Sequence, residues 1–203
     1  MTADADRRIA DARRDPERLG ALLEAYRHYL RLLARVGIGR RLQGKLDASD
    51  VVQEAFLDAH RHFDDFRGTA EGQFVAWLRE ILAGTLSNQV RRYFGTKARD
   101  PRLEVNFAAD LDQSSYGLAQ MLADPRSSPS AAAHRREQSL LIAEALARLP
   151  DDYQTVLVLR HLEGMTFPQV AAAMGRSVDS VEKLWLRGLT QLKKTFAATE
   201  ETA

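Results

Sequence analysis

The feature that most constrains the fold of this chain is the three- and four-residue spacing of its apolar side chains. From Leu19 to Leu33, leucines and one tyrosine recur at this spacing, which is the pattern of a helix with one buried face. The same spacing returns along most of the sequence. No segment sustains the alternation of apolar and polar residues that marks a half-buried strand. The sequence therefore predicts an all-α fold.

The first half of the chain predicts three consecutive helices. The first carries the leucine stripe and ends near residues 37–39, where two glycines stand. The second begins at Ser49 or Asp50, either of which can cap a helix by accepting a backbone N–H group. A polar loop over residues 64–72 follows. The third helix then covers residues 74–92 and ends in a pair of arginines.

Helical spacing fades in the middle of the chain and then returns. A total of 203 residues suits two small domains, and the fading segment is rich in breaking residues. We therefore expect two small helical domains, residues 16–95 and 136–197, joined by a flexible linker over residues 96–135. The breaking residues in this linker are Pro101, Gly117, Pro125, Ser127, Ser128, Pro129 and Ser130.

The second domain contains the pattern of a helix-turn-helix. Thr166 can cap a short helix over residues 167–174, and Gly175 can take the left-handed conformation that ends it. A second helix over residues 178–194 would enter a DNA major groove. The alternative is that two small helices simply pack together, with their Lys and Arg side chains solvated. The apolar stripe expected on the second helix is Val178, Val181, Trp185, Leu189 and Leu192.

The residue types needed for covalent or metal chemistry are scarce. The chain has no cysteine, which removes disulfides, thiolate ligands and a cysteine nucleophile. His60 and His62 stand near several aspartates, but residues two apart on a helix point to different sides and cannot share one ion. No glycine-rich phosphate loop or nucleophile elbow occurs. We expect no enzyme activity, no catalytic residue, no metal and no cofactor.

The bulk properties favour a soluble protein of the cytoplasm without membrane insertion. No apolar run approaches the roughly 18 residues that span a bilayer. Residues 1–18 alternate acids and arginines, unlike a signal peptide. The net charge is +1, so any affinity of the isolated chain for DNA should be weak, because counterion release scales with the phosphates neutralised.

Several motifs together resemble the extracytoplasmic-function (ECF) group of sigma factors in the sigma-70 superfamily. Residues 149–167, with Leu149-Pro150 at their start and Glu163-Gly164-Met165-Thr166-Phe167 at their end, are similar to the opening of that family's region 4. Residues 170–181 continue the match through the turn. In the first half, residues 50–56 (DVVQEAF) and 66–68 (FRG), followed by Phe74 and Trp77, are similar to region 2.

The resemblance implies a transcription initiation factor that binds core RNA polymerase and recognises the −10 and −35 elements of promoter DNA. Its polymerase partners would be the β′ clamp helices and the β flap. Asp50, Gln53 and Glu54 share one helical face and would contact the clamp helices. The alternative for Asp50 is a helix cap, with Gln53 as its capping-box partner.

The resemblance also implies two DNA surfaces. Phe74 and Trp77 fall on the apolar stripe and are expected in the core, whereas Tyr93 lies beyond the stripe and could stack on a base. The residues implied at the −10 element are Arg67, Thr69, Gln73, Asn88, Arg91, Arg92 and Tyr93. The residues implied at the −35 element are Ser177, Ser180, Lys183 and Arg187. Gly84, Asn88, Glu182, Leu184 and Leu186 depart from the family pattern, so no promoter sequence follows.

Two further expectations concern partners. Family members are often held inactive by an anti-sigma factor, which is therefore a third candidate partner, although no residue identifies one. The competing hypothesis is a stand-alone helix-turn-helix transcriptional regulator with the first half as a sensor or dimerisation domain. That hypothesis explains residues 167–194 but leaves the motifs at residues 50–56 and 66–92 as coincidence.

Overall fold

A computed structural model describes residues 2–42, 46–94, 102–122 and 132–200. All regular secondary structure in these ranges is helical, which confirms the all-α prediction. The chain divides into two compact units, Met1–Gln113 and Ser114–Ala203. Within the described ranges, no helix is both long and apolar enough to cross a bilayer.

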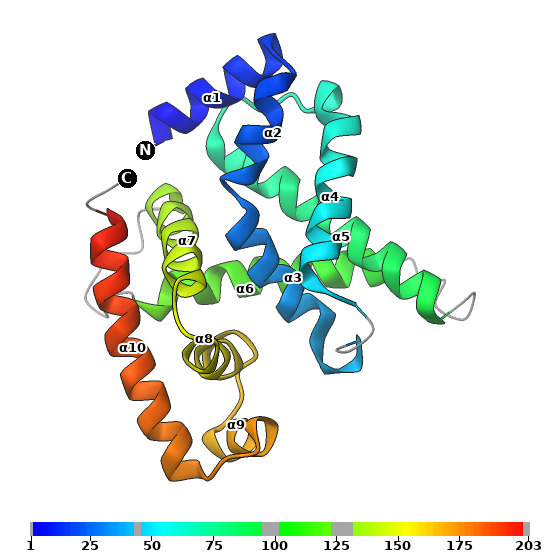
Figure 1. Cartoon of the computed structure of the whole chain (residues 1–203). Helices are drawn as coiled ribbons and strands as arrows, with labels where there is room; N and C mark the ends of the chain where they lie inside the picture. Colours follow the sequence, from blue (N-terminus) through cyan, green and yellow to red (C-terminus); the bar gives the residue numbers. More distant parts are fainter. Residues whose placement is uncertain (1, 43–45, 95–101, 123–131, 201–203) are drawn as a thin grey trace. The chain divides into compact units, whose positions relative to one another are not determined.

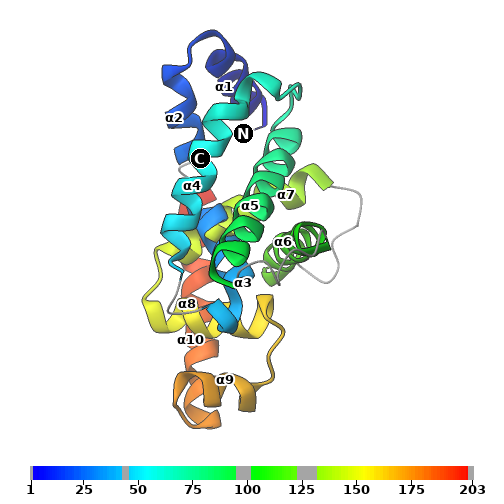
Figure 2. The same cartoon turned by 90° about the vertical axis from the view of Figure 1, so that its right-hand side faces the viewer.

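The first unit is a helical bundle around α5. In it α4 packs against both α3 and α5, while α1 packs against α2 and α5 (Figures 1 and 2). Its elements are α1 (Thr2–Arg14), α2 (Glu17–Glu24), α3 (Arg27–Leu42), α4 (Ala48–His62), η1 (Phe63–Asp65), α5 (Glu71–Phe94) and the first part of α6 (Arg102–Met121).

The leucine stripe is buried as predicted, but it belongs to two helices. Leu19 and Leu33 are 2% and 0% exposed. The helix is interrupted at Ala25 and Tyr26, between the end of α2 and the start of α3. Here the Tyr26 backbone N–H donates to the Leu23 carbonyl at 3.0 Å, a tighter turn than an α-helix makes. The Tyr26 hydroxyl donates to the Glu71 carboxylate at 3.2 Å. The interruption between α2 and α3 thus coincides with a contact between residues distant in sequence, and the spacing of the leucines does not predict it.

Aromatic rings form the core beneath the loop that precedes α5. Phe74 is fully buried, and its ring centroid lies 5.4 Å from Tyr26, 5.5 Å from Phe66 and 5.6 Å from Trp77. Phe63 completes the cluster. Phe74 is therefore a core residue, as predicted, and the half-buried Trp77 packs on its neighbours rather than standing free.

Two helices lie outside the two domains expected from the sequence. Helix α1 precedes residue 16 and buries Ile9 and Ala12. Helix α6 occupies residues 102–121 within the segment expected to be a linker. The sequence does not predict it because serine and alanine make up much of its buried face: Ser114, Ser115 and Ala119 are buried together with Leu111 and Leu118. Such a face does not register as an apolar stripe.

In the second unit, α10 packs against α7, α8 and α9. Its core includes Leu146, Val156, Leu157, Val170 and Leu192, all 1% exposed or less. The helices that follow α6 in this unit are α7 (Ala132–Ala147), α8 (Asp151–Leu157), the π-helical turn η3 (Val158–Leu162), α9 (Phe167–Met174) and α10 (Val178–Glu200). Helix α8 begins after Pro150, with two aspartates in its first turn.

Candidate nucleic-acid interface

The turn between α9 and α10 has the predicted geometry. The Thr166 backbone N–H donates to the Gln169 carboxamide at 2.8 Å, so the two residues form a capping box. Gly175 ends α9 at φ 62° and ψ 35°, a left-handed conformation that is unfavourable for other residues. The Ser177 hydroxyl oxygen then accepts the Ser180 backbone N–H at 3.3 Å. Local hydrogen bonds therefore hold the start of α9 and the start of α10.

The outer face of α10 carries exposed basic side chains near its start. Lys183 and Arg187 are both exposed, whereas Ser180 is half-buried. Lys183 pairs with Asp179 at 2.7 Å, but the two side chains are 66% and 76% exposed. Such an exposed pair contributes only about 0.3–0.5 kcal/mol, so a phosphate or base edge can compete for Lys183. Glu182 is also exposed on this helix, and its negative charge would repel a DNA phosphate.

The buried stripe of α10 differs from the prediction at its ends. Val178 is 38% exposed, so its expected burial is wrong, and Trp185 and Leu189 are half-buried. The closest approach runs instead through Gly188, where an added Cβ would meet Leu157 at 3.5 Å. Val181, Gly188 and Leu192 form the buried line of α10, and residues to either side of this line remain partly accessible.

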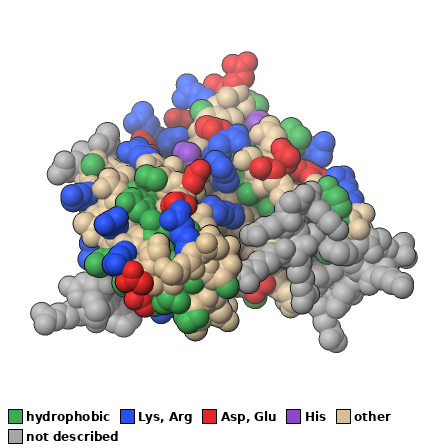
Figure 3. All heavy atoms as spheres, turned by 60° about the horizontal axis from the view of Figure 1, so that its bottom comes forward, with side chains coloured by type: hydrophobic (Ala, Val, Ile, Leu, Met, Phe, Trp, Pro, Cys, Tyr) green, Lys and Arg blue, Asp and Glu red, His purple; other side chains and the backbone are tan. Residues whose placement is uncertain are grey.

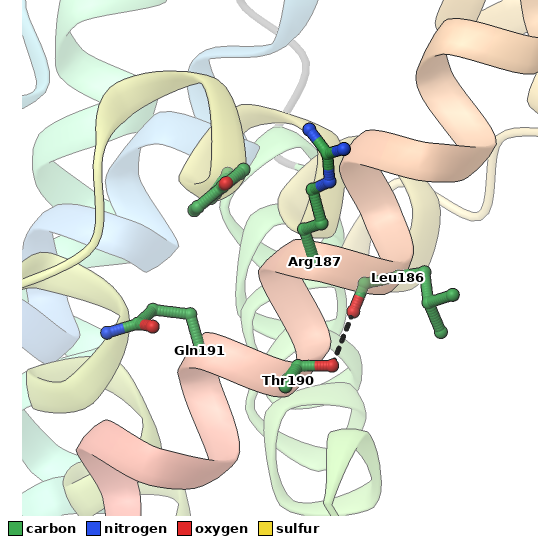
Figure 4. Close-up of a pocket in the computed structure, with 5 residues that line it drawn as sticks. Leu186, Arg187, Thr190 and Gln191 are labelled. Carbon is green, nitrogen blue, oxygen red and sulfur yellow. Dashed lines mark hydrogen bonds between the residues drawn. The ribbon is translucent and has the colours of Figure 1, made fainter.

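Beside this line, α10 and α8 enclose a surface pocket. It is lined by Tyr153, Leu186, Arg187, Thr190 and Gln191. Figure 4 shows the Leu186 and Arg187 side chains projecting on different sides of α10, with the Thr190 hydroxyl donating to the Leu186 carbonyl at 2.9 Å. Leu186 is 61% exposed. A leucine so accessible suits contact with a protein as well as with DNA.

One polar contact at the base of α10 is not visible in the sequence. The Trp185 indole N–H donates to His161 Nε2 at 3.0 Å, and their rings stack at an interplanar angle of 18°. Burial, with a contribution from the charge of Arg160, lowers the pKa of His161 below its usual range. His161 must be neutral to accept this hydrogen bond. The contact joins residues 24 apart, so spacing along one helix could not reveal it.

In the first unit, the loop over residues 66–70 combines two exposed side chains with a tightly packed backbone. Arg67 and Thr69 are exposed, while Phe66 is 7% exposed. A Cβ added to Gly68 would lie 2.5 Å from the Phe66 ring and 2.8 Å from the Gln73 Cβ. The Gln73 carboxamide oxygen accepts the backbone N–H groups of Thr69 and Ala70 at 2.9 and 3.2 Å. Gln73 thus caps α5, a structural role that its sequence position does not indicate.

The far end of α5 presents the remaining residues implied at the −10 element. Asn88 and Tyr93 are exposed, Tyr93 by 51%. Arg91 is exposed and its Nε donates to the Ser87 carbonyl at 3.3 Å. Arg92 lies 3.4 Å from the Glu54 carboxylate, which also accepts a hydrogen bond from Gln89. The end of α5 is therefore tied to α4 through Glu54.

The outer face of α4 carries the residues implied at the polymerase. Asp50 and Gln53 are exposed, and Gln53 accepts a hydrogen bond from Arg27 at 3.4 Å. The cap of α4 is Asp47, whose carboxylate accepts the Ser49 backbone N–H at 2.6 Å. The expected cap at Ser49 or Asp50 is therefore wrong, and so is the alternative that Asp50 serves only as a cap. The reason is that the helix begins at Ala48, earlier than its apolar stripe indicates.

Charge is mixed on the described surface. Figure 3 shows acidic and basic side chains interspersed on the face that it displays. His60 and His62 are exposed on α4, and His62 Nδ1 lies 3.7 Å from the Asp65 carboxylate. Among the described residues, no three His, Cys, Asp or Glu side chains are grouped so that they could hold a metal ion. On that face, a DNA contact would depend on particular side chains rather than on a broad basic field.

Comparison with known proteins assigns both halves. Residues 25–93 match the family model described as Sigma-70 region 2, and residues 139–192 match the model described as Sigma-70, region 4. The two matches stand in the order that the motifs imply. The hypothesis of a stand-alone helix-turn-helix regulator does not explain why residues 25–93 match Sigma-70 region 2.

Individual relatives agree with the family models. The chain is 31% identical over 145 residues to the ECF RNA polymerase sigma-E factor of Haemophilus influenzae, covering 71% of this chain and 72% of that protein. It is 27% identical over 199 residues to the RNA polymerase sigma-H factor of Pseudomonas aeruginosa, covering 97% and 96%. A chain from the cocrystal structure of the flagellar sigma/anti-sigma complex Sigma-28/FlgM is 15% identical with a TM-score of 0.34, covering 91% and 97%, a likeness too low to support a structural argument. The chain therefore belongs to the ECF family of RNA polymerase sigma factors, which direct RNA polymerase to promoters.

Proposed function

We propose that the chain divides promoter recognition between its two halves. The −35 element is read by Ser177 in the turn before α10 and by Ser180, Lys183 and Arg187 on α10. The −10 element is bound by Arg67 and Thr69 of the loop and by the exposed end of α5, with Gln73 supporting the loop. The observation that carries the −35 assignment is the exposure of Lys183 and Arg187 just beyond the Gly175 turn. Arg and Lys there can reach guanine edges or phosphates.

The proposal for the −10 element rests on the side chains at the end of α5. Strand opening takes a base from the stack, and a ring or pocket must offset that unstacking. Tyr93 is an exposed ring beside Asn88, Arg91 and Arg92. We assign base stacking to Tyr93 and phosphate contacts to the two arginines. Arg92 would exchange its exposed partner Glu54 for a phosphate.

We further propose that Asp50 and Gln53 contact the β′ clamp helices of core polymerase. Both are exposed, and neither is needed to cap α4. A carboxylate there meets basic partners and contributes specificity as well as affinity. Glu54 belongs to the same face, but its carboxylate is already engaged by Gln89 and Arg92. A basic group from polymerase would therefore have to share or displace Arg92.

The exposed Leu186 and its adjacent pocket suit an apolar group of the β flap. The functional division would be residues 16–95 for core and −10 binding, residues 136–197 for −35 binding, and residues 96–135 as the connection. The chain would act in the cytoplasm, where the polymerase is, and supply binding energy and strand opening while the polymerase performs the phosphoryl transfer. It would itself be no enzyme.

The direct test is run-off transcription from a genomic promoter library with purified core polymerase, with and without the chain. We expect chain-dependent transcripts that share two spaced elements. Lys183→Ala and Arg187→Ala should each weaken upstream binding by about 1–3 kcal/mol. The matched controls are Lys193→Ala and Lys194→Ala, which remove exposed charges later on the same helix. Silence of the library, with no co-elution with core polymerase, would contradict the proposal.

The clamp contact has its own test. The double variant Asp50→Asn, Gln53→Ala should lower affinity for core polymerase while leaving the melting temperature unchanged. Glu54 is left intact because its loss would also release Arg92 and Gln89. His62→Ala, an exposed change at the end of α4, is the control. Unchanged core affinity in the double variant would refute this surface.

A further inference from the structure

Helix α1 holds the backbone of the loop over residues 66–70 from a distance in sequence. An Arg13 guanidinium nitrogen donates to the Phe66 carbonyl at 2.9 Å and also to the Gly68 carbonyl. The same guanidinium lies over the Phe66 ring, 5.4 Å from its centroid. A single side chain thus fixes the peptide planes that precede Arg67 and Thr69, the two exposed side chains of the loop.

The same helix also holds the start of α5. The Asp6 carboxylate accepts the Glu71 backbone N–H at 2.7 Å, and Glu71 is the first residue of α5. A carboxylate at this place satisfies an N–H group that the helix leaves unpaired and complements the helix dipole. The loop therefore has a tether to α1 on each side of Thr69 and Ala70.

The geometry of α1 explains how one helix supplies both tethers. Asp6 and Arg13 are seven residues apart, so they lie on the same edge of the helix. The adjacent face is anchored in the core, with Ile9 fully buried and Ala12 only 1% exposed. This anchoring fixes the position of the edge. Arg14, one residue later, lies 81% exposed, and its ion pair is with Asp11 at 3.8 Å rather than with the loop.

We propose that Arg13 is a positioning residue for promoter opening. It fixes the loop over residues 66–70 before DNA arrives, so that Arg67 and Thr69 meet the −10 element without first ordering their backbone. Arg13 need not touch DNA itself. A preformed loop avoids the ordering entropy that a free loop would lose on binding. This inference rests on the proposed role of the loop at the −10 element.

The test measures the rate of strand opening by holoenzyme on a duplex promoter recovered with the wild-type chain, at saturating holoenzyme. Arg13→Ala should slow opening by about tenfold, the size expected for a charge-assisted hydrogen bond. Affinity for core polymerase and protection of the −35 element should stay unchanged. Arg14→Ala, the adjacent exposed arginine, should open at the wild-type rate. Arg13→Lys should recover only part of the rate, because an ammonium lacks the fork that spans two carbonyls.

A double-variant cycle separates positioning from a general loss of folding. If Arg13 acts through Arg67, then adding Arg13→Ala to Arg67→Ala should slow opening much less than Arg13→Ala does alone. Equal slowing in both backgrounds would overturn the inference, as would a wild-type opening rate for Arg13→Ala when Arg67→Ala is slow. If Arg67→Ala itself opens normally, the assignment of the loop fails, and the inference fails with it. If Arg13→Ala folds poorly, Arg13→Lys can replace it in the double-variant cycle, because lysine keeps the positive charge and most of the aliphatic side chain.

Discussion

The two glycine turns beside the proposed DNA contacts differ in where their supports come from. At Gly175 the supports are local: the Gly175 and Arg176 backbone N–H groups donate to the Ala171 carbonyl, and Ser177 accepts the Ser180 backbone N–H. At Gly68 the nearby Gln73 holds part of the loop backbone, and further supports come from Arg13 and Asp6 of α1, more than 50 residues away in sequence. The first turn is held by nearby residues alone, whereas the second is held by nearby residues and by α1 together.

This difference has a functional consequence. A locally encoded turn presents α10 as a rigid reading element, which suits a duplex of fixed shape. A loop held by residues distant in sequence couples its geometry to the packing of a whole unit, which suits the contact with opened −10 DNA that we propose for it. The chain offers a convenient way to test the two regions separately, because it has two tryptophans, Trp77 in the first unit and Trp185 in the second. Variants with one tryptophan report one unit each.

The largest expected effect is on the aromatic core beneath the Gly68 loop of the first unit. Phe74→Ala removes a fully buried ring from the aromatic cluster and should lower the free energy of unfolding by about 3–5 kcal/mol. Urea unfolding followed by Trp77 fluorescence, with Trp185 replaced by Phe, measures the loss. The Trp185 signal, in a Trp77→Phe background, should keep its midpoint. Equal destabilisation of both signals would show that the two units unfold together.

Next in size is the substitution at the Gly68 turn. Gly68→Ala places a Cβ against Phe66 and Gln73, both of which are held in place, and should destabilise the first unit by about 1–3 kcal/mol. Gly20→Ala is the matched control, since nothing lies within 4 Å of its added Cβ and α2 should gain stability. If Gly68→Ala is as harmless as Gly20→Ala, the packed loop is not required.

The Gly175 turn should respond differently. Gly175→Ala keeps open space around the new Cβ but forces alanine to φ 62°, so we expect a loss of about 1–2 kcal/mol from backbone strain alone. The Trp185 signal should report this loss while the Trp77 signal does not. Gly175→Asn should recover part of it, because asparagine tolerates the left-handed region. Equal stability of the Ala and Asn variants would contradict the strain account.

The cap of α4 distinguishes a structural from a binding carboxylate. Asp47→Ala should lower the stability of the first unit by about 1 kcal/mol, whereas Asp50→Ala should leave stability unchanged. The hydrogen bond from the Ser49 backbone N–H holds the pKa of Asp47 below its usual range. The contribution of Asp47 is therefore present above its unfolded pKa and is lost as pH falls through the lower folded pKa. A larger loss of stability from Asp50→Ala than from Asp47→Ala would contradict the assignment of Asp47 as the cap of α4.

The smallest effect is the pH dependence of the second unit. Because the pKa of His161 is lowered on folding, the unfolded chain takes up a proton near its ordinary value of 6.5 while the folded unit does not. The unfolded state then binds more protons, so stability should fall as pH drops below that value. His161→Gln retains an acceptor for Trp185 and should flatten the slope, whereas the exposed His60→Gln should not. A slope unaffected by His161→Gln would exclude this histidine as its source.

Much of the fold could be predicted because its signals are local. The cap at Thr166, the left-handed Gly175 and the short helix between them follow from residue types at fixed spacing. The buried Phe74 follows from its place on an apolar stripe. The sequence motifs of regions 2 and 4 also assign the two halves correctly, because each motif lies within a short stretch of the chain.

What could not be predicted depends on contacts between distant residues or on weak apolar signals. The docking of Asp6 and Arg13 on the loop joins segments that no short pattern connects. Gln73 and Glu54 were expected at binding surfaces, yet their side chains are engaged within the unit by the loop backbone and by α5. The roles assigned to individual residues at polymerase and DNA stay predictions, since burial and hydrogen bonding describe the free chain.

The most direct test of the division between the two regions is a pair of footprints of the holoenzyme on one promoter. Hydroxyl-radical protection reports upstream binding, and permanganate reactivity of thymines reports opened −10 DNA. We predict that Arg67→Ala keeps upstream protection and loses permanganate reactivity, whereas the double variant Lys183→Ala, Arg187→Ala loses upstream protection. If both variants altered the same positions, or if neither altered any, the assignment of one promoter element to each region would be contradicted.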